Sequence, residues 1–268
     1  LNHAVVAGIL LFSAPDAPVR GLDRVAALGG VAAVGIAHHH MFVLMLPVGL
    51  FGLYRSIVES ATDPWTVAGI GLGVASLGLL PYGYLVWVTR RVPDAYHWGE
   101  VRGWEELVHT FLRRDYGTFE LTSGGNQVGA QYQLAKLFSE SAADLMYAPL
   151  ALSVVGMARP FVGGNDEGRP GDSFPWGHVS VLGALLLSGP LFVILIGRGV
   201  SGADFLHLRK FHAQFEMLAV FFAALGATFL MQYVTRKWVS VGLLVGLALA
   251  GVLHAVPYLQ THTGPTVE

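Results

Sequence analysis

The sequence predicts an all-α fold, a polytopic transmembrane helical bundle with about seven membrane segments and an interfacial amphipathic helix. Hydrophobic residues make up 53% of the 268 residues and charged residues only 13%, and the mean hydropathy is +0.55. A soluble domain carries about 25% charged residues, so this chain has too few polar groups to cover a surface that faces water. The third observation is a series of long apolar stretches separated by polar segments.

Net charge and cysteine content exclude several functions. The formal net charge is -2, and the chain has no cysteine. We therefore expect no nucleic-acid partner, and disulfides, thiolate metal sites and cysteine nucleophiles are excluded. Metal-ligating residues do not recur at a usable spacing, so the sequence predicts no metal ligands and leaves a metal requirement open.

The first stretch, 1–13, is too short to cross a membrane, because a spanning helix needs about 20 apolar residues. It begins at Leu1, without the charged and small-residue pattern of a signal peptide. We interpret it as the tail of a helix, and we expect the chain to be processed or N-terminally incomplete.

The second stretch, 25–54, is too long for one ordinary span and is interrupted by the histidine triplet His38, His39 and His40. Two interpretations are open. One is a long tilted helix with histidines in mid-membrane, and the other is a pair of short helices that meet at the histidines. Three imidazoles in hydrocarbon would each need a partner, so the sequence favours the pair.

The remaining chain completes a single transmembrane domain, 1–260, followed by a polar tail, 261–268. The further predicted membrane segments are 65–88, 134–157 with an apolar core from Tyr147, 179–196, 211–233 and 238–259. An extramembrane loop, 90–131, separates the first two of these. Lys and Arg counts place this loop in the cytoplasm if 25–54 is one span, but they are nearly balanced if it is two helices.

Inside this loop an amphipathic helix is predicted over 103–115. Its apolar residues recur at helical spacing, at Trp104, Leu107, Val108, Phe111 and Leu112.

Such a helix lies in the membrane interface, and its C-terminal end would present Arg113, Arg114 and Tyr116 near the lipid headgroups. Arginine pairs well with phosphate oxygens, which indicates a lipid-linked phosphate as a ligand. The alternative is an anchor helix whose arginines only meet anionic headgroups.

The stretches "LPYGYLVWVTRRVPDAYHWGE" and "WEELVHTFLRRDYGTF" carry a resemblance. They combine a Leu-Pro-Tyr at the end of a span, the Trp-Gly-acid motif of Trp98, Gly99 and Glu100, and Phe-Leu-Arg-x-x-Tyr-Gly-Thr-Phe over 111–119. Two weaker matches flank them, "VGIAHHHMFVLMLP" and "LRKFHAQFEMLAVFFAALG". The chain resembles a bacterial relative of a membrane family that is similar to protein O-mannosyltransferases of the GT-C type.

The resemblance implies a glycosyltransferase that moves a mannose-like sugar from a polyprenyl-phosphate carrier to a protein or glycan acceptor. It implies an integral protein of the bacterial inner membrane with loop 90–131 facing the periplasm, or of the endoplasmic reticulum membrane with the loop facing the lumen. It also implies a catalytic acidic residue, which we expect to lie outside this chain. The residues expected to bind the substrate or lipid phosphate are Arg113, Arg114, Tyr116, Trp98, Glu100, His39 and His40.

Two other function classes stay open. A non-catalytic membrane subunit or scaffold of a larger protein complex would also lack the acidic residue. A haem-binding or proton-conducting subunit is suggested by the 11 histidines, several of which stand at the ends of predicted spans, although haem ligation needs two imidazoles at equal depth on facing helices.

Overall fold

A computed structural model describes residues 1–38, 40–91, 101, 103–111, 129–145, 147–162, 176–196, 203–231 and 242. The secondary structure of these residues consists of helices, which confirms the predicted all-α membrane class. The chain divides into two compact units, Leu1–Leu137 with Phe174–Leu218, and Phe138–Ser173 with Ala219–Glu268. The assignment of 1–260 to one domain with an extramembrane loop and a polar tail stays a prediction.

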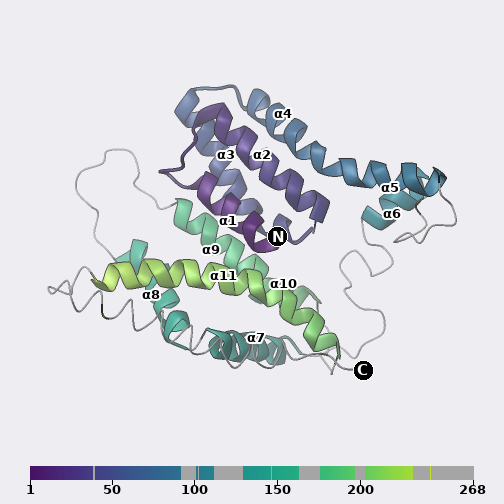
Figure 1. Cartoon of the computed structure of the whole chain (residues 1–268). Helices are drawn as coiled ribbons and strands as arrows, with labels where there is room; N and C mark the ends of the chain where they lie inside the picture. Colours follow the sequence, from purple (N-terminus) through teal and green to yellow (C-terminus); the bar gives the residue numbers. More distant parts are fainter. Residues whose placement is uncertain are drawn as a thin grey trace. The chain divides into compact units, whose positions relative to one another are not determined.

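The α-helices of Figure 1 are α1 (Asn2–Ser13), α2 (Gly21–His38), α3 (Leu46–Ser60), α4 (Pro64–Ala75), α5 (Leu80–Arg91), α6 (Trp104–Phe111), α7 (Ala130–Asp144), α8 (Ala148–Val162), α9 (Trp176–Ser188), α10 (Pro190–Ile196) and α11 (Ala203–Met231). Two short 3-10 helices, η1 (His40–Met45) and η2 (Ser76–Leu79), lead into α3 and α5.

In the first unit α2 packs against α1, α3 and α4 (Figure 1). Glycines bring these helices close together. A β-carbon on Gly29 would lie 2.9 Å from Cβ of Val74 on α4, and one on Gly52 of α3 would lie 2.8 Å from Leu28 of α2. Close approach at small residues is typical of helices that associate within membranes, where lipid gives no hydrophobic drive for helix association.

The histidine triplet separates two helices, as the sequence favoured, and the long-helix alternative is wrong. α2 ends at His38 and η1 begins at His40. The chain then turns back, so that α3 packs against α2 and Phe42 occupies the space beside Gly35. The 3-10 turn therefore lies at the C-terminal end of α2.

Within the described ranges, four helices are long and apolar enough to cross a membrane. They are Met41–Ser60, Pro64–Arg91, Trp176–Ile194 and His212–Met231. The predicted total of about seven segments stays a prediction.

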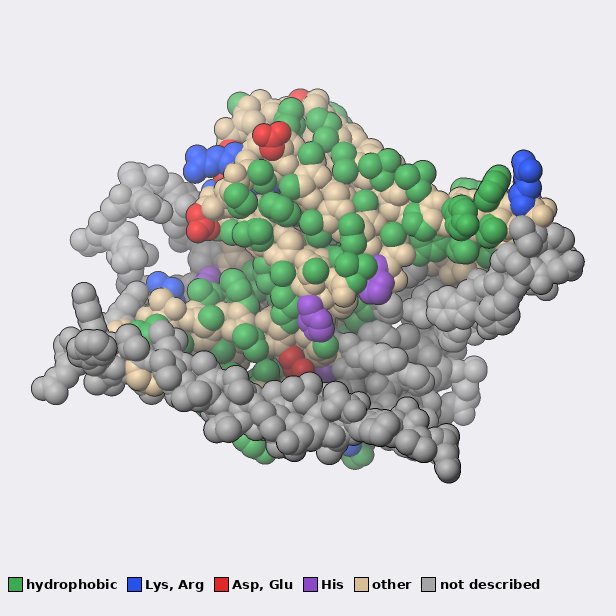
Figure 2. Space-filling view, in the orientation of Figure 1, with side chains coloured by type: hydrophobic (Ala, Val, Ile, Leu, Met, Phe, Trp, Pro, Cys, Tyr) green, Lys and Arg blue, Asp and Glu red, His purple; other side chains and the backbone are tan. Residues whose placement is uncertain are grey.

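Apolar side chains on the outside of these helices indicate contact with lipid. Trp65 is 83% exposed and Leu72 is 72% exposed, both on α4. Figure 2 shows hydrophobic side chains spread over the visible face of α1 to α5, with few charged groups among them. Such a surface is unfavourable in water and favourable in a bilayer, so the protein is an integral membrane protein.

Two predicted segments contain a break. Segment 134–157 is divided, because α7 ends at Asp144 and α8 begins at Ala148, next to Tyr147 with its positive φ of 56°. Segment 179–196 is divided at Gly189, where the ring of Phe215 fills the space that a β-carbon would need. Segment 238–259 lies outside the described residues, apart from position 242.

In the second unit α8 and the C-terminal part of α11 cross at two glycines. A β-carbon on Gly156 would clash with the carbonyl of Phe222, and one on Gly226 would clash with the carbonyl of Leu152. Near this crossing the guanidinium of Arg159 lies 6.0 Å from the ring centre of Phe229, within reach of a cation–π contact. The two backbones therefore approach closely at the crossing.

Candidate functional site

The substrate-binding residues predicted from the sequence fall almost entirely outside the part of the chain that the structure describes. His40 begins η1. The others, His39, Trp98, Glu100, Arg113, Arg114 and Tyr116, lie outside the described residues. Their roles stay predictions.

The described part of the predicted interfacial helix is α6, Trp104–Phe111. The rings of Tyr82 on α5 and Phe111 on α6 meet edge to face, with centres 5.2 Å apart. The hydroxyl of Tyr82 donates to the carbonyl of Ile36, near the C-terminal end of α2, at 3.1 Å. The C-terminal end of α6 and the 3-10 helix η1 therefore lie at the same end of α2. Trp104, at the start of α6, is 77% exposed.

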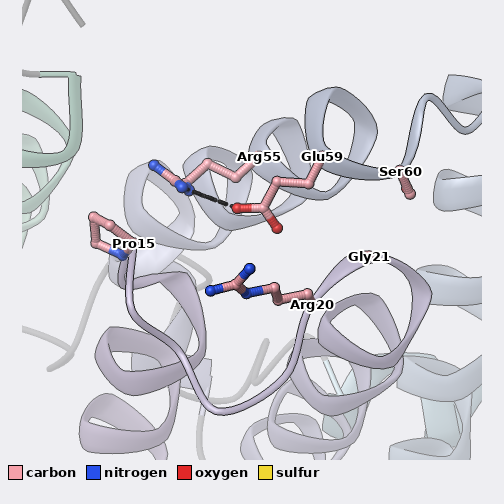
Figure 3. A pocket seen from close by; sticks show the side chains of 6 residues that line it. All are labelled: Pro15, Arg20, Gly21, Arg55, Glu59 and Ser60. Atoms are coloured by element: carbon pink, nitrogen blue, oxygen red, sulfur yellow. Dashed lines mark hydrogen bonds and ion pairs between the residues drawn. The ribbon is translucent and has the colours of Figure 1, made fainter. Parts of the chain in front are cut away.

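A cavity of about 540 Å³ lies at the opposite end of α2, where the chain passes from α1 to α2 and leaves α3. Figure 3 shows the side chains that surround it. The lining residues are Pro15, Arg20, Gly21, Arg55, Glu59 and Ser60.

Two arginines on different helices pair with one glutamate beside this cavity. Arg55 donates to Oε1 of Glu59 from Nη2 at 2.9 Å and from Nε at 3.3 Å. Nη1 of Arg24 lies 2.9 Å from Oε2 of the same carboxylate. Arg55 and Glu59 are four residues apart on α3, whereas Arg24 comes from the first turn of α2. The glutamate therefore joins α2 to α3 at this end.

Arg24 is completely buried, and its side chain is only partly satisfied. Nη2 donates to the carbonyl of Ala14 at 3.4 Å. Nε makes no hydrogen bond to a described group, and Nη1 is close to Glu59 but poorly aligned for a hydrogen bond. Burying a cation is costly unless it is well paired. The α2–α3 contact therefore contains a cation whose hydrogen-bonding capacity is not filled by the described residues.

The charges around the cavity do not balance. Three arginines, Arg20, Arg24 and Arg55, surround a single carboxylate, Glu59. Arg20 is exposed, lines the cavity and makes no hydrogen bond or ion pair with any described residue. Figure 3 shows Arg20 extending into the space below Glu59. The site is therefore positively charged and suited to an anion.

Sequence reasoning missed this cluster. One sequence feature could have indicated it. Arg24 lies in a largely apolar helix, and a charged residue in such a helix indicates a buried partner or a functional site. The spacing of Arg55 and Glu59 also predicts a helical ion pair. Neither signal identifies Glu59 as the partner of Arg24, because that contact depends on how α2 and α3 pack.

Apolar spans, glycine-mediated helix contacts and charges gathered at helix ends define a helical integral membrane protein. In an alignment of 177 positions that covers 64% of the chain, the sequence is 25% identical to Protein O-mannosyl-transferase tmem260 of Dictyostelium discoideum. The chain spans about a fifth of that protein's length, because the match covers 20% of it. No protein-family model matches the sequence, and no solved structure matches it.

This similarity supports the predicted resemblance to O-mannosyltransferases. The signature motif over 111–119 and a bacterial origin stay predictions.

Proposed function

We propose that this chain is part of a membrane glycosyltransferase that transfers a mannose-like sugar from a polyprenyl-phosphate carrier to a protein or glycan acceptor. The observation that carries the proposal is the 25% identity over 177 residues to an O-mannosyl-transferase. The membrane spans are consistent with a lipid-linked donor, since such a carrier must be reached from within the bilayer.

The position of α6 supports the proposed roles of the residues that follow it. Phe111 packs on Tyr82, which is bonded to the end of α2. The last residue of α6, Phe111, and the C-terminal end of α2 therefore lie at the same end of the first unit, and the proposed residues follow these two points in the sequence.

The reaction would release a lipid phosphate from the sugar, and cationic donors at its oxygens stabilise the charge that develops there. We assign this role to Arg113 first and Arg114 second, with His39 and His40 as further donors. Trp98 and Tyr116 would stack on the sugar, and Glu100 would bind an acceptor hydroxyl. The catalytic residue stays unassigned. We propose that loop 90–131 faces the periplasm in a bacterial cell, or the lumen in the endoplasmic reticulum membrane.

The test is a transfer assay on the protein as its own cells make it, with a polyprenyl-phosphate-linked mannose donor. Arg113→Ala is expected to lower kcat by about 100-fold, the usual effect of removing one donor from a developing oxyanion. Arg91→Ala removes an equal charge from the last turn of α5 and should leave kcat unchanged.

Wild-type rates in both Arg113→Ala and Arg114→Ala would contradict the assignment of the phosphate site. A protein that transfers no sugar at all would favour the non-catalytic subunit.

A further inference from the structure

We propose that the cavity between Arg20, Arg55 and Glu59 binds the phosphate group of an anionic lipid headgroup. The site lies at the other end of the first unit from Phe111, the last residue of α6. α2 has 18 residues, so it separates the two ends of the first unit by about 27 Å at 1.5 Å per residue. This cavity lies at the N-terminal end of α2, and α6 lies at the C-terminal end.

The level of the cavity in the membrane suits a lipid headgroup. One candidate span ends at Ser60 and the next begins at Pro64, and Ser60 itself lines the cavity. The ends of the spans mark the level at which hydrocarbon gives way to headgroups. A phospholipid beside α3 would therefore carry its phosphate at the height of the cavity.

The charge of the cavity suits a phosphate. Glu59 accepts from Arg55 and pairs with Arg24, so one carboxylate already serves two guanidinium groups. Arg20 then remains as a cation that lines the cavity without a partner among the described residues. Guanidinium groups bind phosphate oxygens through paired hydrogen bonds. Three acidic residues nearby in sequence, Asp16, Asp23 and Asp63, are exposed and do not line the cavity.

The backbone contributes to the same site. Gly21 lines the cavity and begins α2, where helix N–H groups and the helix dipole attract anions. Gly21 has a φ of +52°, and a β-carbon there would lie 3.2 Å from Cβ of Ser60. Glycine therefore leaves this side of the cavity free of a side chain, in a backbone conformation that other residues rarely adopt.

The size of the cavity distinguishes a headgroup from a free ion. Its volume of about 540 Å³ falls within the range of about 300–1,000 Å³ that is usual for small-molecule sites. A bare phosphate would fill only a small part of it. A phosphate that carries a glycerol group fits better.

The experiment measures lipid binding rather than sugar transfer, so its result is independent of the proposed function. The purified full chain in nonionic detergent is titrated with phosphatidic acid or with phosphatidylcholine of the same acyl chains, and retained lipid is counted by native mass spectrometry. Phosphatidic acid is expected to bind more tightly. Equal retention of the two lipids would overturn the proposal.

Arg20→Ala is the decisive variant, because Arg20 supports no other described group and its loss should leave the fold intact. Removal of one charged hydrogen-bond donor is expected to weaken phosphatidic acid binding roughly tenfold, and Arg20→Lys should restore part of it. Arg91→Ala, at the far end of α5, is the charge-matched control. Equal losses in Arg20→Ala and Arg91→Ala would show nonspecific attraction and overturn the site.

Inorganic phosphate alone distinguishes the two sources of the ligand. It is expected to leave the bound phosphatidic acid in place. Complete displacement by inorganic phosphate, sensitive to Arg20→Ala, would support phosphate recognition by these arginines but overturn the lipid as its source.

Discussion

The two ends of α2 are held to their neighbours by different chemistry. At the N-terminal end, Arg24 and Arg55 pair with Glu59 beside a cavity. At the C-terminal end, the Tyr82 hydroxyl donates to a backbone carbonyl and its ring meets Phe111. One end depends on charges and the other on a neutral hydrogen bond and aromatic packing.

The difference shows where this protein depends on specific partners. A buried charge that loses its partner is strongly unfavourable, whereas a neutral hydrogen bond between membrane helices contributes little, about 0.6 kcal/mol on average. We therefore expect substitutions at the charged end to cost more stability than substitutions of similar size at the aromatic end.

The largest effect is expected for Glu59→Ala. It would leave Arg24 buried without its carboxylate and also remove the partner of Arg55, so it should destabilise the protein by about 3–5 kcal/mol. Thermal unfolding in detergent measures this as a fall in Tm. Glu105→Ala removes a carboxylate that is exposed on α6 and should leave Tm unchanged.

A paired apolar replacement sharpens this test. Arg24→Met together with Glu59→Leu removes the buried cation and its partly exposed carboxylate partner. Replacing a buried ion pair by apolar side chains is often neutral or stabilising. The double variant should recover most of the stability that Glu59→Ala loses. If the double variant is as unstable as the single one, the loss comes from packing and not from the unpaired charge.

A smaller effect is expected for Gly78→Ala, between the two ends. A β-carbon at Gly78 would clash with the carbonyl of Ala33 on α2 and lie 2.8 Å from Cβ of Ile36. Overpacking of this kind costs about 1–3 kcal/mol, and the shift of η2 away from α2 should also weaken the bond of Tyr82 to Ile36.

Gly73→Ala is the matched control for this variant. A β-carbon at Gly73 meets nothing within 4 Å, so alanine should raise Tm slightly by its better helix propensity. If Gly73→Ala lowers Tm as much as Gly78→Ala does, the loss in Gly78→Ala does not come from the clash with α2.

Much of the fold could be predicted because membrane insertion leaves local signals. The apolar length of 65–88 predicts the span that the structure shows as Pro64–Arg91. The cost of placing imidazoles in hydrocarbon predicts the break after His38. The break between α7 and α8 was harder to predict from the sequence. Hydropathy describes how apolar a stretch is and not how its backbone turns at Tyr147.

The charged cluster could be predicted only in part, for a physical reason. Arg55 and Glu59 are four residues apart on one helix, and that spacing alone predicts their pairing. The contact between Arg24 and Glu59 joins residues 35 positions apart and forms only because α2 and α3 pack together. The cavity and the excess of positive charge beside it follow from that packing and from the turn at Gly21.

The smallest effect is expected for Tyr82→Phe, which removes only the hydroxyl that donates to Ile36 at 3.1 Å. The ring and its edge contact with Phe111 are retained, so the cost should be about 1 kcal/mol or less. Tyr84→Phe, on an exposed face of α5, is the control and should not change Tm. A loss as large as that of Glu59→Ala would mean that the bonded carbonyl has no alternative donor. The two ends of α2 would then depend equally on specific polar partners, one charged and one neutral.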